Sequence, residues 1–358
     1  MEGAMAVVDA LLRRVRRLDP GCFALVMATG IVSVDASQHG MPRLALALFV
    51  FNLIAYAWLL VLTALRLLRF RHGMVADFVD PSRGAGFLTL AAATSVLGSQ
   101  CLLVVSCPRL ALGLAIAGAV LWLALIYLFF AATITARFKP GFTRSINGGW
   151  LVAVVSTQAL AALVALIAGH APTPRGGWLF VALCLYLLGA ALYLLIITLV
   201  VYRMVFFPMR AREFTPPYWI DMGALAVTTL AGSLVVINTP AASPLLPLLP
   251  FVKGFTLFFW ATASWWIPLL VILELWRHIW RHVPVRYETD DWDIVFPIGM
   301  YTVGTFELAQ ALHLDFLRTI PAVGVYVSLL AWLLVALIGL RRLYRSQFRH
   351  APHVHPHG

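Results

Sequence analysis

Charged side chains are scarce in this chain. Only 11% of its 358 residues are Asp, Glu, Lys or Arg, and 62% are hydrophobic, whereas charged residues make up about 25% of an average soluble protein. No polar stretch is long enough to form a second, soluble domain. Because the apolar runs are long enough for helices that cross a bilayer, the sequence excludes a soluble globular fold. It predicts an all-α polytopic membrane protein surrounded by lipid.

Cysteine is also rare, with only four residues. Cys22 and Cys184 fall in apolar segments, while Cys101 and Cys107 lie near the end of one segment. A bridge between the latter two is the less favoured alternative to free thiols. The sequence shows no nucleotide, zinc or nucleophile motif. It therefore predicts no cofactor, no metal site and no enzymatic activity, although a membrane-embedded enzyme stays as a third, disfavoured class.

Acidic residues are fewer than basic ones, 15 against 26, which gives a formal net charge of +11. The basic residues do not form a nucleic-acid-binding patch. Instead 21 of the 26 fall in the termini and in alternate loops, and the intervening loops hold the other five. Because cytoplasmic loops are enriched in Lys and Arg, this pattern predicts cytoplasmic termini and an even number of spans. The minority five are Arg43, Arg109, Arg175, Lys253 and Arg318.

The chain divides into three predicted parts. Residues 1–20 form a cytoplasmic segment in which AMAVVDALLRRVRR, residues 4–17, is expected to lie on the membrane surface as an amphipathic helix. Residues 21–343 form a single transmembrane transport domain, and 344–358 form a His-rich cytoplasmic tail. A solvated tail is favoured over a metal site for its histidines. These are His350, His353, His355 and His357.

Ten spans are predicted, and they alternate in composition. The even spans are rich in Leu, Val and Ile, which suits lipid, whereas the odd spans are short and rich in Gly, Ala, Ser and Thr. Each odd span begins with an aromatic residue, so one helical hairpin recurs five times. The predicted spans are 21–38, 44–68, 84–105, 110–134, 147–169, 178–206, 218–237, 251–276, 292–311 and 321–343. The aromatic residues are Phe23, Phe87, Trp150, Trp219 and Trp292.

Five equivalent hairpins arrange most simply around a pseudo-five-fold axis normal to the membrane. Because small residues allow close approach and hydroxyls are costly against lipid, the odd helices are expected inside and the even helices outside. The inner ring then encloses a narrow pore. The small and hydroxyl-bearing residues at mid-depth are its predicted lining, with hydrogen bonds to neighbouring backbone as the alternative role. They are Thr29, Gly30, Ser33, Thr94, Ser95, Ser156, Thr157, Thr228, Thr229 and Thr302.

The segment WDIVFPIGMYTVGTFEL, residues 292–308, is the predicted working centre. Pro297 lacks a backbone donor and its ring clashes with the preceding turn, so a bend is expected there. A bend in a membrane is tolerated where it is buried in protein or meets a cavity. Phe296 sits at this bend, either as a buried core residue or as a plug in the pore.

These residues resemble a known family. VMATGIVS at 26–33, the five hairpins and WDIVFPIGMYTVGT at 292–305 are similar to the tellurite-resistance/dicarboxylate transporter family. That family includes TehA-type bacterial channels, plant slow anion channels and fungal malate and sulfite transporters. The resemblance implies a homotrimer in the bacterial inner membrane, with one pore per subunit and with a phenylalanine gate at Phe296 on the ninth span.

Two carboxylates near the outer ends of odd spans, Asp35 and Glu307, are candidates for proton coupling. The favoured function is passive transport of small anions, either inorganic anions or mono- and dicarboxylates. No odd span holds a Lys or Arg at mid-depth, which favours conduction over tight anion binding. A proton-coupled C4-dicarboxylate or malate carrier that uses Asp35 or Glu307 is the alternative.

Overall fold

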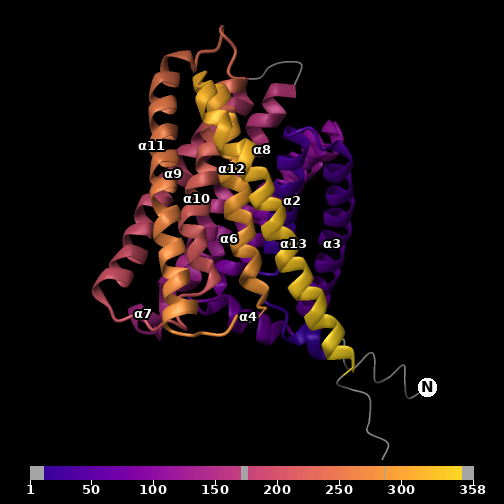
Figure 1. The fold of residues 1–358 in the computed structure, drawn as a ribbon, viewed down its shortest axis with the longest axis vertical. Helices are drawn as coiled ribbons and strands as arrows, with labels where there is room; N and C mark the ends of the chain where they lie inside the picture. The colour runs from indigo at the N-terminus through magenta and orange to yellow at the C-terminus, as the bar shows by residue number, and fades with distance from the viewer. Residues whose placement is uncertain (1–11, 171–175, 286, 349–358) are drawn as a thin grey trace, which may run out of the picture.

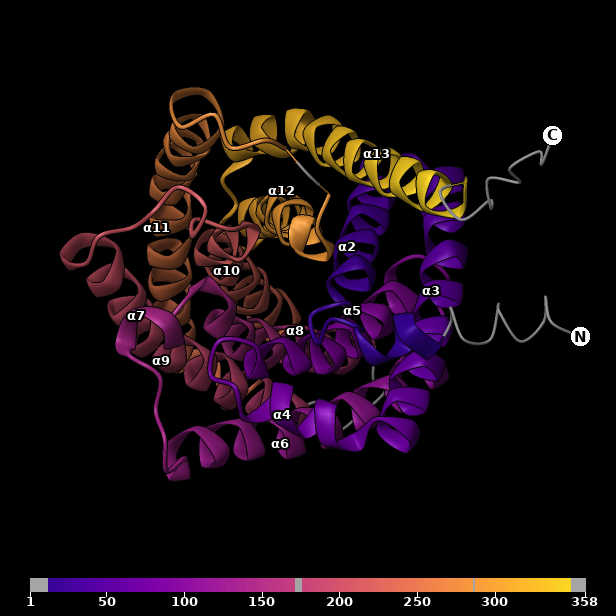
Figure 2. The ribbon, with the colours of Figure 1, turned by 90° about the horizontal axis from the view of Figure 1, so that it is seen from below.

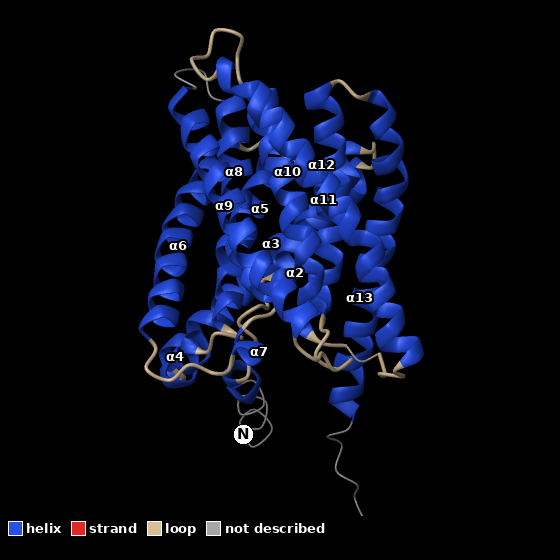
Figure 3. Ribbon diagram, turned by 90° about the vertical axis from the view of Figure 1, so that its left-hand side faces the viewer, coloured by secondary structure: helices blue, strands red, loops and turns tan. Residues whose placement is uncertain are grey.

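The computed structural model describes residues 12–170, 176–285 and 287–348, without the side chains of 343–348. The described residues contain helices and no strands (Figure 3). Eight of the described helices are long and apolar enough to cross a membrane. The helix α2, Ala24–Gln38, is apolar but shorter, and α12, Trp292–Leu312, carries Asp293 and Glu307. The chain is therefore a polytopic membrane protein.

The long helices form two concentric layers (Figures 1 and 2). The inner layer closes on itself, because each inner helix packs against the next one along the chain and the last packs against the first. The inner helices are α2, α5 (Thr89–Leu103), α8 (Val152–His170), α10 (Ile220–Asn238) and α12. The outer helices are α3 (Pro42–Arg69), α6 (Pro108–Thr135), α9 (Gly176–Phe206), α11 (Leu249–Leu275) and α13 (Thr319–Phe348).

Composition decides which layer a helix occupies. The most apolar stretch of Gly148–His170, which contains α8, is 100% buried inside the protein, whereas that of Asp315–Arg342, on α13, is 17% buried. Outer helices leave Leu, Val, Ile and aromatic side chains exposed, which suits contact with lipid. Inner helices contain the small residues that allow close backbone approach. The sequence alternation between lipid-suited and small-residue spans thus corresponds to the outer and inner layers.

The N-terminal ends of the inner helices meet at one end of the molecule. Short 3₁₀ turns precede four of them, namely η1 (Gly84–Leu88), η2 (Gly148–Leu151), η3 (Pro216–Trp219) and η6 (Thr289–Asp291). Successive turns contact one another, and the Thr89 hydroxyl donates to the backbone oxygen of Pro20, next to the start of α2. The inner helices therefore run parallel, which aligns their backbone dipoles. The aromatic residues of the sequence repeat are all buried at this end.

The observed helix ends and cysteines can be compared with what the sequence predicts. The last helix continues to Phe348, five residues beyond the predicted span. The predicted amphipathic helix at 4–17 is described only from residue 12, and residues 12–16 are helical. The histidine tail lies outside the described residues. All four cysteines are free, so the bridge between Cys101 and Cys107 is absent. Two short helices, α4 (Arg71–Val79) and α7 (Phe142–Ser145), join long helices of the bundle.

Close packing of α10 against α12 generates a prediction about stability. A Cβ added at Gly223 would lie 2.7 Å from Cγ of Pro297, whose ring cannot rotate away. We expect Gly223→Ala to lower stability by about 1–3 kcal/mol, because overpacking forces backbone shifts. Thermal unfolding in detergent measures the change. Gly254→Ala on α11 is the matched control, since a Cβ there meets nothing within 4 Å. Equal melting temperatures for wild type and Gly223→Ala would contradict this packing.

Candidate functional site

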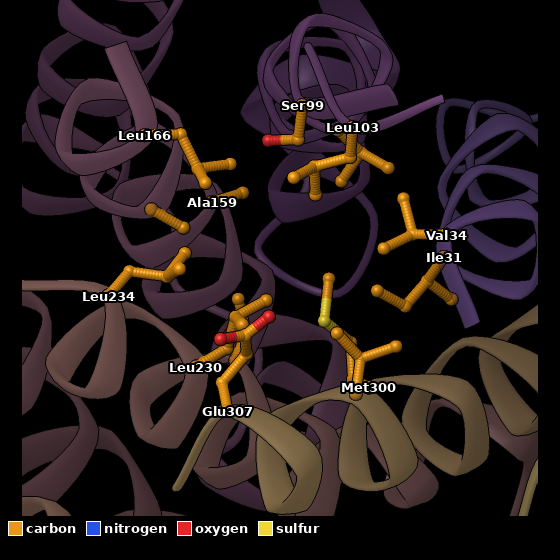
Figure 4. A pocket seen from close by; sticks show the side chains of 14 residues that line it. Ile31, Val34, Ser99, Leu103, Ala159, Leu166, Leu230, Leu234, Met300 and Glu307 are labelled. Carbon is orange, nitrogen blue, oxygen red and sulfur yellow. The ribbon is translucent and has the colours of Figure 1, made fainter. Parts of the chain in front are cut away.

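A cavity lies between the five inner helices (Figure 4). About 20 Å³ of it is open to the centres of water molecules, which is room for about one water. Every inner helix contributes lining side chains, and most of them are apolar. The lining residues are Ile31, Val34, Val96, Ser99, Leu103, Ala159, Ala162, Leu166, Val227, Leu230, Leu234, Met300, Val303 and Glu307.

The lining follows helical periodicity. On α12 the lining residues are Met300, Val303 and Glu307, which are three and four residues apart and so share one face. The same spacing recurs on α5, α8 and α10, and the two lining residues of α2 are three positions apart. All the lining residues lie in the middle or in the C-terminal half of their helices. Each inner helix therefore turns one continuous stripe toward the centre of the ring.

The same stripes can be followed one turn toward the N-terminal ends. The residue four positions before the first lining residue lies on the same helix face. All five of these residues are buried, and four are smaller or more flexible than a phenylalanine ring. They are Met27, Ala92, Val155, Gly223 and Phe296. Helical spacing thus assigns Phe296, which is 1% exposed, to the face of α12 that continues from the cavity lining.

Glycines hold α12 close to both of its inner neighbours around Phe296. Gly223 on α10 accommodates the ring of Pro297, and a Cβ at Gly299 would lie 2.8 Å from Cγ2 of Ile31 on α2. Close approach on both sides leaves little freedom for α12 to shift. The local sequence FPIG thus fixes the position of α12 at Phe296 relative to the neighbouring inner helices α2 and α10.

The predicted pore-lining residues lie elsewhere. None of the ten is among the side chains that line the cavity. Most of the hydroxyls donate to the carbonyl oxygen of the preceding turn, as those of Ser95, Thr228 and Thr302 do. Ser33 donates to the backbone oxygen of Ala45 on α3, and Gly30 packs near Val96. Their backbone partners lie within the inner layer or on an outer helix.

Polar aromatic side chains of the outer helices complete these contacts. The Trp122 indole donates to Thr157 at 2.8 Å, and the Trp332 indole donates to Thr29 at 3.0 Å. Tyr56 and Thr94 share a hydrogen bond of 2.7 Å. Such bonds satisfy hydroxyls away from water. The signal that sequence reasoning missed is a Trp or Tyr on four of the five outer helices, α3, α6, α11 and α13, that bonds an inner hydroxyl from outside.

Two polar side chains reach the cavity, Ser99 and Glu307, and Glu307 is the only charged residue of its lining. Gln38 donates to Oε1 of Glu307 at 2.6 Å, and the carboxylate points into the cavity (Figure 4). Asp35 is placed differently, between α2 and α13. It accepts a hydrogen bond from Ser328 at 2.6 Å and lies 3.1 Å from Nδ1 of His39. Of the two predicted proton-coupling residues, only Glu307 lines the cavity.

Acidic residues gather before the N-terminus of α12, outside the helix. Burial, together with the nearby carboxylates of Asp19, Glu288 and Asp291, raises the pKa of Asp290 to about 7. Arg83 partly offsets this effect and forms an ion pair with Asp77 at 2.6 Å. In the described part of the chain, no group of three or more His, Cys, Asp or Glu residues could hold a metal ion. The effect of this acidic cluster is therefore electrostatic, because its carboxylates raise the pKa of Asp290 at this end of the inner layer.

An inner ring around a narrow cavity, covered by lipid-suited helices, defines a membrane transport protein. Residues 17–340 match the voltage-dependent anion channel family, SLAC1, and the chain belongs to that family. This match confirms the resemblance seen in the sequence. Membership implies anion transport by an integral membrane protein, in a family of channels and transporters rather than enzymes.

Relatives cover most of the chain. An uncharacterized transporter of Methanocaldococcus jannaschii is 24% identical over 347 residues, which span 93% of this chain and 97% of the relative. A second uncharacterized transporter of that organism is 26% identical over 311 residues, or 83% and 85%. An uncharacterized membrane protein of Mycobacterium tuberculosis is 39% identical over 152 residues, which are 42% of this chain and 77% of the relative.

The raised pKa of Asp290 predicts a pH-dependent stability. Its carboxyl holds a proton in the folded state up to about pH 7 but loses it near pH 3.8 when exposed. Stability from this group is therefore present at low pH and is lost as pH rises from about 4 to about 7. We expect Asp290→Asn to raise the melting temperature above that of wild type at neutral pH, with the difference vanishing at low pH. A difference that is the same at every pH would contradict this origin.

Proposed function

We propose that this protein passes small anions passively across the membrane through the lumen of its inner ring. In this proposal α2 and α12 are spans as well, so the chain crosses the membrane ten times as five hairpins around a pseudo-five-fold axis. The observation that carries the proposal is the cavity, to which all five inner helices contribute. The closed sequence of contacts between those helices supports it.

The parallel inner helices favour anions at one mouth of this pathway. The N-terminal end of a helix carries a partial positive charge of about half an elementary charge. Five such ends meet at the end that the basic loops assign to the cytoplasm. Together they attract anions, and they act against the opposing field of the carboxylates of Asp19, Glu288 and Asp291 at the same end. Two further parts of the proposal are that both termini lie on the cytoplasmic side of the bacterial inner membrane and that the protein is a homotrimer.

Phe296 is the proposed gate. Helical spacing supports this role, because Phe296 lies four residues before the lining residue Met300 and so on the same face of α12. The residues one turn before the cavity lining on α5 and α8, Ala92 and Val155, are smaller than a phenylalanine side chain, and an apolar plug at this depth excludes water. An anion then meets a dewetted barrier of low dielectric constant, which costs several kcal/mol to enter. Opening requires rotation of the Phe296 side chain, or a movement of α12 near Pro297 that first breaks the close packing at Gly223 and Gly299.

A second candidate function is the proton-coupled dicarboxylate carrier. The position of Glu307 in the cavity lining favours it, since a carboxylate there is accessible to a substrate and a proton. Asp35 does not line the cavity, so a proton-coupled carrier would depend on Glu307 alone. The two functions differ in whether anion flux follows the membrane voltage alone or also the pH gradient, which flux measurements in liposomes separate.

The gate is tested by truncating its side chain. We expect Phe296→Ala to raise anion current through the reconstituted protein at least about tenfold, because each ~1.4 kcal/mol removed from a barrier is a factor of ten. Phe259→Ala is the control, since Phe259 is a fully buried phenylalanine on the outer helix α11. It should cost stability without raising current. A folded Phe296→Ala protein with wild-type current would refute the gate.

A further inference from the structure

We infer that Glu307 is a proton-controlled binding site for the passing anion, and that it selects oxyanions that accept a strong hydrogen bond, such as carboxylates. In its protonated form Glu307 donates a hydrogen bond to the anion, and in its ionised form it repels the anion. This inference rests on the proposed function, because it assigns a substrate class to the same lumen.

Only one of the two carboxylate oxygens of Glu307 accepts a hydrogen bond from the described residues. Among the residues that the structure describes, Gln38 is its only hydrogen-bond partner, and the Gln38 amide donates to Oε1. This contact fixes the side chain toward the cavity, where Figure 4 shows the carboxylate among apolar residues. The carboxyl group is thus held by one oxygen and offers the other to the lumen. A group fixed in this way is suited to bind a ligand at low reorganisation cost.

The surrounding side chains give an anion no other charged partner in the cavity. The remaining lining is aliphatic or thioether except for the hydroxyl of Ser99, and it includes no Lys or Arg. Like charges in a medium of low dielectric constant repel strongly. An ionised Glu307 would therefore exclude anions of every kind. A protonated Glu307 turns the same position into a hydrogen-bond donor, which favours a carboxylate over chloride because charge-assisted O–H···O bonds are short and strong.

The elements packed against α12 carry further titratable or charged groups in this region of the molecule. In their halves nearest Glu307, these groups are Asp35 and His39 at the end of α2, Asp315 and Arg318 on η7 (Asp315–Arg318), Lys253 on α11 and Tyr326 on α13. Asp35 is engaged with Ser328 and His39, and Arg318 with Asp315 at 3.2 Å. The α10 half nearest Glu307, up to Asn238, carries no titratable side chain.

The proton balance is simple. Glu307 takes a proton from water, shares it with the anion through an O–H···O bond, and keeps it when the anion leaves. No covalent bond to carbon is formed or broken, and nothing is oxidised or reduced. The transported species is the anion itself, so transport carries current. Current is therefore expected to fall as pH rises, because Glu307 loses its proton.

The test uses the purified full-length protein in planar bilayers, with formate and chloride as the two probe anions. Formic acid that leaks through lipid carries no current, so the readout reports the protein alone. We expect wild-type formate current to fall at least about tenfold between about pH 5 and about pH 8. Reversal potentials at the lower pH should show formate more permeant than chloride.

Glu307→Gln is the decisive variant, because it keeps the shape and a hydrogen-bond donor but cannot ionise. Its current should change less than about twofold over the same pH range, since no proton is lost. Asp315→Asn, which removes a carboxylate that is 84% exposed, is the control and should behave as wild type. If Glu307→Gln keeps the wild-type pH dependence, this inference is refuted and the proposed function stands. If neither protein carries anion current at any pH, both are refuted.

Discussion

The polar groups of the five closely packed inner helices must find hydrogen-bond partners within the protein, because lipid tails offer none. The rest of the structure follows from this constraint. The inner helices carry hydroxyls, amides and carboxylates, and nearly all are buried. Backbone carbonyls of the preceding turn satisfy many of them. Trp122 and Trp332 on outer helices satisfy others. The outer layer therefore has two functions: it faces lipid with one side and completes the hydrogen bonds of the inner layer with the other.

This arrangement leaves the centre of the ring almost free of polar groups. Apolar side chains line the cavity, and in our proposal Phe296 closes the pathway one turn nearer the N-terminal end of α12. A narrow apolar lumen conducts only when it opens and wets, which suits a gated anion pathway. Glu307 is then the one charged group that an anion passes inside the cavity. Its position in the cavity, fixed by Gln38, makes it the residue on which selectivity depends in our proposal.

The sequence predicts the layers well and the lumen poorly, for a physical reason. Lipid imposes a strong compositional rule on the outer helices, so the alternation of spans, the repeat and the buried aromatic at the start of each inner helix can be read directly. An inner helix is buried on every side, so its sequence shows no apolar stripe that would mark the lumen. Hydroxyls such as those of Thr157 and Thr228 are predicted pore residues, and in the structure they bond to backbone oxygens or to the outer layer. Only contacts between helices distinguish Glu307 in the lumen from Asp35 behind it.

In our proposal the stripe that faces the cavity, rather than the hydroxyl-bearing faces of the inner helices, forms the anion pathway. The most direct test compares Ala162, which lines the cavity, with its neighbour Ala161, which does not. Each is replaced by cysteine in a protein whose four native cysteines are serine, and silver ion, which is small and binds thiols, is added during anion flux in liposomes. We predict that silver blocks flux through Ala162→Cys and leaves Ala161→Cys unaffected. Block of Ala161→Cys alone would contradict this assignment of the pathway.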